Sequence, residues 1–337
     1  MKSPITGKEM KMMQKKDKID FRKESFEILF HYYLCEDSNE VFTDATLDTL
    51  NLNQAYNQYR EKYKIPFPDD IKDIRMKYGL SAAKMADILG FGTNVYRQYE
   101  AGEVPNVSNA RLIELAKDPE EFKKLTLLSS TFKEKEHAGF FKNLDRLIKE
   151  EQSFADTALP HYLMHGVGPG GPGIYTGYRT PNLRKLMEMI IFFTVHIQPW
   201  KTKMNKLLFY ADFLHFKKTC FSMSGAEYVA IHLGPVPQNF NSIFEYAAIH
   251  SKIDITYREF SNGGVGESFS PNKDTSFNAG LFEEAELDVL KIVADTFKES
   301  STREMIDISH EEPAWLENIG EMKKIKYDYA FRLKHFG

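Results

Sequence analysis

The chain has 337 residues and a mass of 39.0 kDa, a size typical of two or three domains. Hydrophobic residues make up 42% and charged residues 27%, so each domain can bury a core. The formal net charge is −4, which excludes a global electrostatic attraction to nucleic acid. Any DNA binding therefore has to come from one part of the chain and its own local contacts.

The chain has only two cysteines, Cys35 and Cys220. This number excludes a disulfide framework and favours a reducing compartment. No apolar run near the start has the length of a signal peptide. The longest run, "LMEMIIFF" at residues 186–193, is far shorter than the roughly 20 residues of a membrane span. We therefore expect a soluble, cytoplasmic protein.

The first 65 residues predict a small sheet followed by a helix. Every second residue from Phe26 to Leu34 is apolar or aromatic, the period of a strand, and "EVFT" suits a second short strand. Asp44 can cap a helix that Pro66 ends.

Residues 66–121 contain apolar positions spaced as in four short helices, with glycines between them. A charged helix and the loop "GVGPGGPGIYTG" follow. From Pro181 a separate unit is expected, with two apolar helices, a short strand, a helix, a strand pair and two more helices. We predict a mostly α protein with small β-sheets (α+β) in four parts: 1–65, 66–121, 122–180 and 181–337.

The clearest local pattern is that of a helix-turn-helix. Ser81 caps a helix, residues 90–92 turn the chain, and a second helix is expected from Thr93 to Tyr99. Amide and guanidinium groups can pair with adenine and guanine edges, and a threonine methyl can touch a thymine methyl. The predicted DNA-binding residues are Thr93, Asn94, Arg97 and Gln98.

Charge leaves an alternative open for this region. Residues 66–120 hold seven basic and nine acidic residues, and phosphate attraction dominates the affinity of most DNA binders. One copy should bind weakly, so we expect two copies on a palindrome with half-sites about 34 Å apart or a multiple of it. The alternative is a four-helix bundle that makes only protein contacts.

The segment "LGFGTNVYRQYEAGEVP" at residues 89–105 resembles the helix-turn-helix of the MqsA/YgiT-type antitoxins, within the Xre/Cro group. The resemblance implies base contacts from Asn94 and Gln98. That family also places a zinc domain with two Cys-x-x-Cys pairs before this element.

This sequence departs from the zinc pattern. The corresponding segments are "SPIT", with Ser3 and Thr6, and "CEDS", with Cys35 and Ser38. One thiolate remains of the four that a closed structural site uses, and hydroxyls are poor zinc ligands. We therefore predict a zinc-free remnant of a zinc ribbon, with no metal and no cofactor.

The stretch "GAEYVAIHLGPVPQNF" at residues 225–240 contains a conformationally restricted "HLGPVP". Pro235 and Pro237 fix two backbone torsions, and Gly234 permits a conformation that other residues avoid. A stiff corner between a strand and a helix explains this stretch without any function.

Three motifs together resemble the Panacea, or SocA-like, antitoxin domain. They are "KLLFYAD" at residues 206–212, the turn at 225–237, and Ser309-His310 with Trp315. His232 stands where many members have tyrosine. The resemblance covers residues 181–337 and implies neutralisation of a toxin encoded nearby by direct binding. At the level of the domain we predict toxin contacts at Tyr228, His232, Pro235, Pro237 and Trp315.

The catalytic and metal patterns in the chain are weak. "GVGPGG" at 166–171 has no preceding strand, and "HYLMH" at 161–165 lacks the glutamate of a zinc helix. Cys220 with His215 has no orienting third group, and nothing shows that Asp212 lies near Glu227. No enzyme is predicted.

The sequence thus predicts an antitoxin that neutralises its toxin through residues 181–337 and binds its operator through the helix-turn-helix, repressing its own operon. The alternative is a transcriptional regulator whose C-terminal domain binds a ligand or another regulator. An enzyme built on that domain is the third hypothesis and requires a deep polar pocket.

Overall fold

The computed structural model describes residues 1–129, 134–151, 159–160, 162–164, 171–259, 264–321 and 323–336. The chain is built from helices with small antiparallel sheets, which confirms the predicted α+β class. It divides into two compact units. The first unit comprises Met1–Lys18, Glu27–Gln54 and Leu159–Gly337, and the second comprises Ile19–Phe26 and Ala55–Ala158. The four-part division expected from the sequence stays a prediction.

The N-terminal sheet has the strand order β1 (Lys11–Phe21), β2 (Glu24–Cys35) and β3 (Glu40–Phe42). The alternation of apolar residues predicted β2 correctly, and β3 pairs with it antiparallel. Strand β1 was not predicted, because its lysine-rich sequence is largely exposed and has no apolar face. Asp44 accepts a hydrogen bond from the Leu47 amide at 2.9 Å, so it caps α1 (Ala45–Tyr63) as expected.

The second unit contains six helices that the structure describes after α1. Tyr78, Tyr96 and Phe122 lie in their shared core, and Leu144 from the last helix packs against it. The Tyr96 hydroxyl donates to the Ile71 carbonyl at 2.7 Å, so this buried phenol is satisfied. The helices are α2 (Pro68–Lys77), α3 (Ala82–Ile88), α4 (Val95–Glu100), α5 (Val107–Leu115), α6 (Pro119–Leu128) and α7 (Glu134–Glu151).

Two arginines hold the loop that follows α4. Arg60 of α1 is fully buried and donates to the Gly102 carbonyl at 2.6 Å. Arg22 donates to the Val104 and Pro105 carbonyls at 2.6 and 2.8 Å. Hydrogen bonds from charged donors are the stronger kind, so these contacts fix the backbone just after α4.

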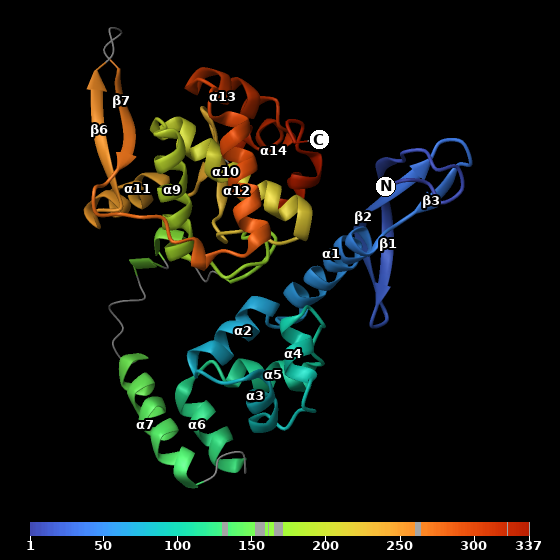
Figure 1. The fold of residues 1–337 in the computed structure, drawn as a ribbon, viewed down its shortest axis with the longest axis vertical. Coiled ribbons are helices and arrows are strands. Elements are labelled where there is room, and N and C mark those ends of the chain that lie inside the picture. The colour runs from blue at the N-terminus through green and yellow to red at the C-terminus, as the bar shows by residue number, and fades with distance from the viewer. Residues whose placement is uncertain are drawn as a thin grey trace. The chain divides into compact units, whose positions relative to one another are not determined.

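The helices of the first unit surround α10 (Lys201–Thr219), which packs against its neighbours on several sides (Figure 1). Its residues from Lys203 to Phe216 are all buried. A helix that is buried all round cannot keep a polar face in water, so its polar side chains need partners inside the protein. Around it lie α9 (Leu183–Ile197), α11 (Phe240–Ile249), α12 (Glu284–Phe297), α13 (Thr302–His310) and α14 (Pro313–Leu316), with the short 3₁₀ helices η1 (Ala279–Leu281), η2 (Ile319–Glu321) and η3 (Tyr327–Arg332).

A three-stranded sheet with the order β5-β4-β8 packs on α10. It contains β4 (Tyr228–Ile231), β5 (Gly234–Pro237) and β8 (Lys324–Ile325). The "GPVP" residues, expected to form a corner, are therefore a strand, paired antiparallel with β4. Strand β5 lies at the sheet edge, where prolines are tolerated because no ladder donor is required on the outer side.

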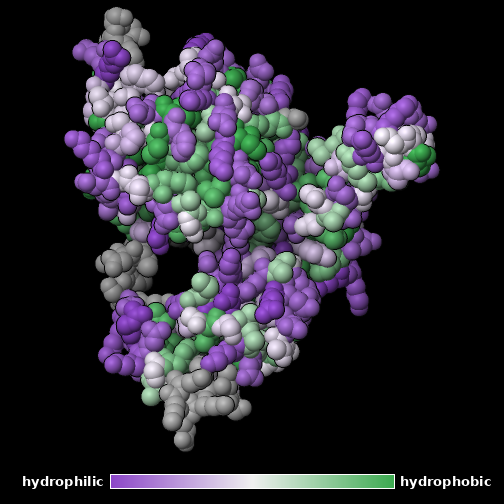
Figure 2. Space-filling view, viewed as in Figure 1, coloured by the Kyte–Doolittle hydropathy of each residue, from purple (hydrophilic) through white to green (hydrophobic). Residues whose placement is uncertain are grey.

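Strands β6 (Ile253–Glu259) and β7 (Val265–Pro271) form a separate two-stranded hairpin that projects from the helices of this unit (Figure 1). On the face shown in Figure 2, hydrophobic side chains gather over the part of the unit that contains α9 and α12. Val195 of α9 and Ile292 of α12 are exposed hydrophobic residues. Within the described residues, none of the helices is both long and apolar enough to cross a membrane.

Candidate functional site

The predicted DNA-reading residues lie at the start of α4 and in the turn before it. Ser81 caps α3 by accepting a hydrogen bond from the Lys84 amide at 3.2 Å, as expected. The next helix begins at Val95, two residues later than predicted, so Thr93 and Asn94 belong to the turn. The Asn94 side chain does not cap the helix.

All four predicted base contacts are exposed: Thr93, Asn94, Arg97 and Gln98. Tyr96 and Tyr99, on the opposite face of α4, are buried in the core and hold the helix against α2 and α3. Arg75 is unavailable for phosphate, because it forms two hydrogen bonds with Glu100 at 2.5 and 3.3 Å. The structure therefore leaves these four side chains accessible to solvent, and base contact by them stays a prediction.

A cluster of hydroxyls surrounds Cys35 at the end of β2. The Ser3 hydroxyl donates to the Cys35 sulfur at 3.2 Å, and the Thr6 hydroxyl lies 3.7 Å from it. Hydrogen bonds from Ser3 and then Ser38 lower the pKa of Cys35 to about 6. The residues that replace a zinc-binding set therefore do converge in space. A cluster of one thiol and three hydroxyls does not suit zinc, which prefers sulfur and nitrogen donors in structural sites.

The "KLLFYAD" motif on α10 supplies buried polar groups with separate partners. Asp212 is fully buried and accepts hydrogen bonds from the Met223 and Ser224 amides at 2.8 Å, the Ser224 hydroxyl at 2.6 Å and the Tyr228 hydroxyl at 2.8 Å. Burial raises the pKa of Asp212 against the opposing effect of these bonds. The carboxyl group therefore ties α10 to β4.

A second buried carboxyl group, Glu312, ties the other side of α10. It accepts from the Tyr210 hydroxyl at 3.2 Å and from the Lys334 and His335 amides at 2.8 and 3.3 Å. The sequence analysis did not single out Glu312. Its signal is present in "SHEEPAW", where one of two adjacent glutamates follows a helix and precedes a proline, but sequence alone does not show which one is buried.

Lys206 lies where α10 meets β5. It is fully buried, and its ammonium group donates to the Pro235 carbonyl at 3.0 Å. Burial lowers the pKa of Lys206 to about 7. Gly234 is required beside it, since a Cβ there would lie 2.6 Å from Lys206 Cε and 2.5 Å from the Ser309 hydroxyl, and its φ is +102°.

The five residues predicted to contact a toxin divide by burial. Tyr228, Pro235 and Pro237 are buried, so they support the sheet and offer no contact surface in this state. His232 is exposed in the turn between β4 and β5, and Trp315 is partly exposed on α14. The Trp315 indole N–H donates to the Ile231 carbonyl at 2.8 Å, which joins α14 to that turn.

His310 completes this arrangement at the end of α13. Its ring stacks on Trp315 with centroids 3.8 Å apart and an interplanar angle of 9°. Burial, and then the charge of Lys206, lower the pKa of His310. His310 and Trp315 of the late motif are therefore in contact, and they form an aromatic pair beside the β4–β5 turn.

The rejected catalytic pairs do not form a catalytic arrangement where the structure describes them. Cys220 is buried, which raises the pKa of its thiol, and burial lowers the pKa of His215 to about 4. Asp212 is bound as described above, whereas Glu227 pairs with Lys324 at 2.7 Å. His161, His165 and residues 166–170 lie outside the described residues.

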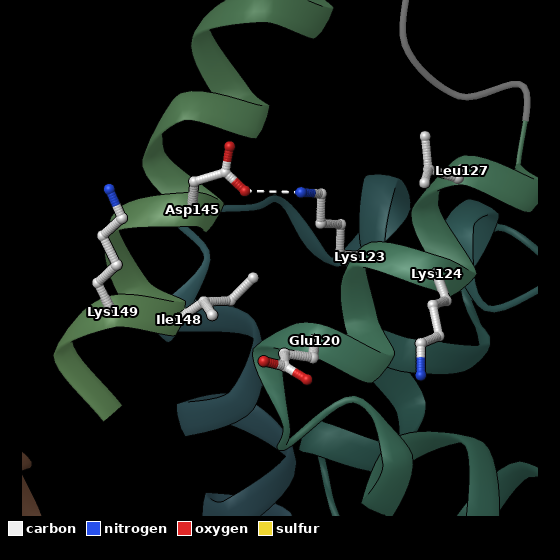
Figure 3. A pocket seen from close by; sticks show the side chains of 7 residues that line it. All are labelled: Glu120, Lys123, Lys124, Leu127, Asp145, Ile148 and Lys149. Carbon is white, nitrogen blue, oxygen red and sulfur yellow. Dashed lines mark hydrogen bonds and ion pairs between the residues drawn. The ribbon is translucent and has the colours of Figure 1, made fainter. Parts of the chain in front are cut away.

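An open pocket between α6 and α7 of the second unit contains none of the predicted site residues (Figure 3). Lys123 and Asp145 pair across it at 2.7 Å. Its lining is charged apart from two aliphatic side chains, Leu127 and Ile148.

Comparison with protein families identifies residues 204–316 as a match to the model "Antitoxin SocA-like, Panacea domain". The match contains the motif on α10, the β4–β5 turn, His310 and Trp315. Searches of curated proteins and of solved structures found no match. Residues 204–316 therefore match a SocA-like Panacea domain, which supports an antitoxin-type role.

The Cys35 cluster predicts that zinc binding can be restored. Four sulfurs at about 2.3 Å from a tetrahedral zinc lie about 3.8 Å apart, close to the 3.2 and 3.7 Å that separate Ser3 and Thr6 from Cys35. We expect the purified wild-type protein to hold no zinc and the triple variant Ser3→Cys/Thr6→Cys/Ser38→Cys to hold one zinc per chain by elemental analysis. Stoichiometric zinc in the wild type would contradict the prediction of a zinc-free remnant.

Lys206 predicts a pH-dependent stability difference. The pKa of this lysine is about 7 in the folded state and near 10.5 in the unfolded chain. Between these values the unfolded state binds more protons than the folded state, so the wild-type free energy of unfolding rises with pH. The stability cost of burying the charged Lys206 is therefore greatest below pH 7. Lys206→Met removes this dependence.

Denaturant unfolding across this pH range measures the effect. The stability of Lys206→Met relative to wild type should be highest below pH 7 and should fall steadily towards pH 10.5. Lys218→Met, at an exposed position on the same helix, is the matched control and should show no such trend. A Lys206→Met difference that does not change with pH would contradict the lowered pKa.

Proposed function

We propose that this chain is an antitoxin that neutralises a toxin encoded by a neighbouring gene through direct binding by the first unit. The observation that carries the proposal is the Panacea match at residues 204–316. The exposed residues beside the β4–β5 turn support binding of a protein, because the motif side chains underneath are engaged in hydrogen bonds within the domain.

We further propose that the second unit binds operator DNA as a helix-turn-helix and represses transcription of the chain's own operon. Support comes from α3, the turn and α4, with Thr93, Asn94, Arg97 and Gln98 exposed on one surface. The balance of charge in this region favours two copies on a palindromic operator. Arg22 and Arg60 stabilise the backbone after α4 and so support the orientation of that surface.

Co-expression tests the antitoxin proposal. Each adjacent reading frame is expressed alone and together with the full chain, and growth is scored. We expect one neighbour to arrest growth and the full chain to relieve the arrest, because a bound toxin cannot reach its target. A set of neighbours that includes no toxin would contradict the proposal and would favour a transcriptional regulator.

The double variant Asn94→Ala/Gln98→Ala separates the two activities. Each amide that pairs with a base edge contributes roughly 1 to 3 kcal/mol of discrimination, so binding to the DNA upstream of the gene should weaken at least about tenfold at fixed salt. Protection against the toxin should remain.

Asn143→Ala on α7 is the control substitution for this measurement. The binding assay is fluorescence anisotropy with a labelled duplex, and an unrelated duplex reports non-specific binding. Unchanged operator affinity in the double variant would contradict the proposed surface and would favour a bundle that makes only protein contacts.

A further inference from the structure

The β5 strand, α13 and α14 pack against one another, and exposed apolar and acidic side chains lie on these elements and on the β4–β5 turn. We call this set of side chains the 232/316 surface: His232, Leu233, Trp315 and Leu316, bordered by the carboxylates of α13. Leu233 is 44% exposed and Leu316 is 51% exposed. The Trp315–Ile231 hydrogen bond holds the two parts together.

The acidic border follows from helical geometry. Glu304, Asp307 and Glu311 are spaced i, i+3 and i+7, so they lie along one side of α13 and its last turn, and all three are exposed. Of the other carboxylates nearby, Glu312 is buried and Glu317 pairs with Arg332 at 2.9 Å, so the exposed negative charge lies mainly on α13. Arg303 pairs with Asp307 at 3.2 Å, but both groups are exposed and the pair is weak.

The neighbouring histidine does not cancel this negative charge. Burial, and then the charge of the nearby Lys206, lower the pKa of His310, which disfavours the charged form of its ring. The Lys206 ammonium group itself is enclosed beneath β5. The 232/316 surface thus combines an apolar centre with a negative rim.

We propose that the 232/316 surface is where the toxin docks, and that the toxin presents there an apolar side chain surrounded by lysine or arginine residues. This inference rests on the proposed antitoxin function and names the surface and the chemistry of the partner. Charge complementarity argues for a basic partner, because an acidic rim accelerates encounter with positive charge and opposes acidic partners. Tryptophan is enriched among the residues that carry most of the binding energy of protein interfaces, which favours Trp315 as a contact.

The rigid support beneath the surface suits it to binding. His310 stacks on Trp315, and Trp315 donates to the Ile231 carbonyl, so the indole is already fixed before a partner arrives. Little side-chain freedom remains to be lost at this residue on binding, which favours affinity.

The apolar part of the proposal is tested with Leu316→Asp in the full-length chain. The substitution places a charge at the centre of the contact, and we expect the dissociation constant for the toxin to rise at least about tenfold. Ile249→Asp is the control, at a side chain that is 79% exposed at the end of α11. Both variants are compared with wild type in thermal unfolding and in growth rescue against the toxic neighbouring gene product.

The charge part is tested with Asp307→Asn/Glu311→Gln, which leaves Glu304 in place because that residue caps α13. We expect affinity for the toxin to fall several-fold at low salt and to become less dependent on salt than in the wild type. Glu245→Gln/Glu284→Gln removes two exposed carboxylates elsewhere in the unit and should behave as wild type.

The outcomes separate the two proposals. If the wild type protects and Leu316→Asp protects equally with unchanged affinity, the docking surface is wrong while the antitoxin function stands. If the affinity of Asp307→Asn/Glu311→Gln for the toxin depends on salt as strongly as that of the wild type, the proposal that the partner is basic is wrong. If light scattering shows that Leu316→Asp only abolishes a homodimer and leaves toxin affinity intact, the surface binds a second copy instead. If the wild type protects against no neighbour, both proposals fail.

Discussion

The structure of the first unit depends on the complete burial of α10 together with its polar side chains. An uncompensated buried charge or hydroxyl costs several kcal/mol in a domain whose total stability is of the order of 10 kcal/mol. Hydrogen bonds that join Asp212 to β4, Tyr210 to Glu312 and Lys206 to β5 offset part of this cost. The same contacts position the β4–β5 turn and α14, so burial of one helix determines where the exposed surface lies.

Much of the fold could be predicted because its elements carry local signals. The alternation in β2, the caps at Ser81 and Asp44, and the apolar spacing of α9 and α10 are properties of short stretches of chain. Two strands, β1 and β5, were not predicted, and this has a physical cause. β1 has no apolar face, and β5 contains two prolines, so each depends on a partner strand that the local sequence does not identify.

The candidate site could be predicted only as a set of motifs. The family resemblance brought together residues of α10, the β4–β5 turn and the late Ser-His-Trp motif, and the structure places them in contact. The resemblance does not show which of these motif residues are exposed and which are buried. Tyr228 and Pro235 are buried, whereas Leu233, inside the quoted turn, and Leu316, just after Trp315, are exposed and were not among the predicted contacts. Motif membership often reflects packing, and exposure depends on tertiary structure.

The distribution of charge gives each unit a different class of partner. DNA phosphates are repelled by the carboxylates of α13, so any nucleic acid should bind elsewhere on the chain. In the second unit Arg75 is bound by Glu100, while Arg97 is exposed beside Asn94 and Gln98. For the proposed helix-turn-helix this arrangement offers base contacts with weak phosphate attraction, so we expect its specificity to depend on two copies binding one operator. For the proposed toxin contact on the first unit we expect the opposite, because exposed carboxylates attract a basic protein.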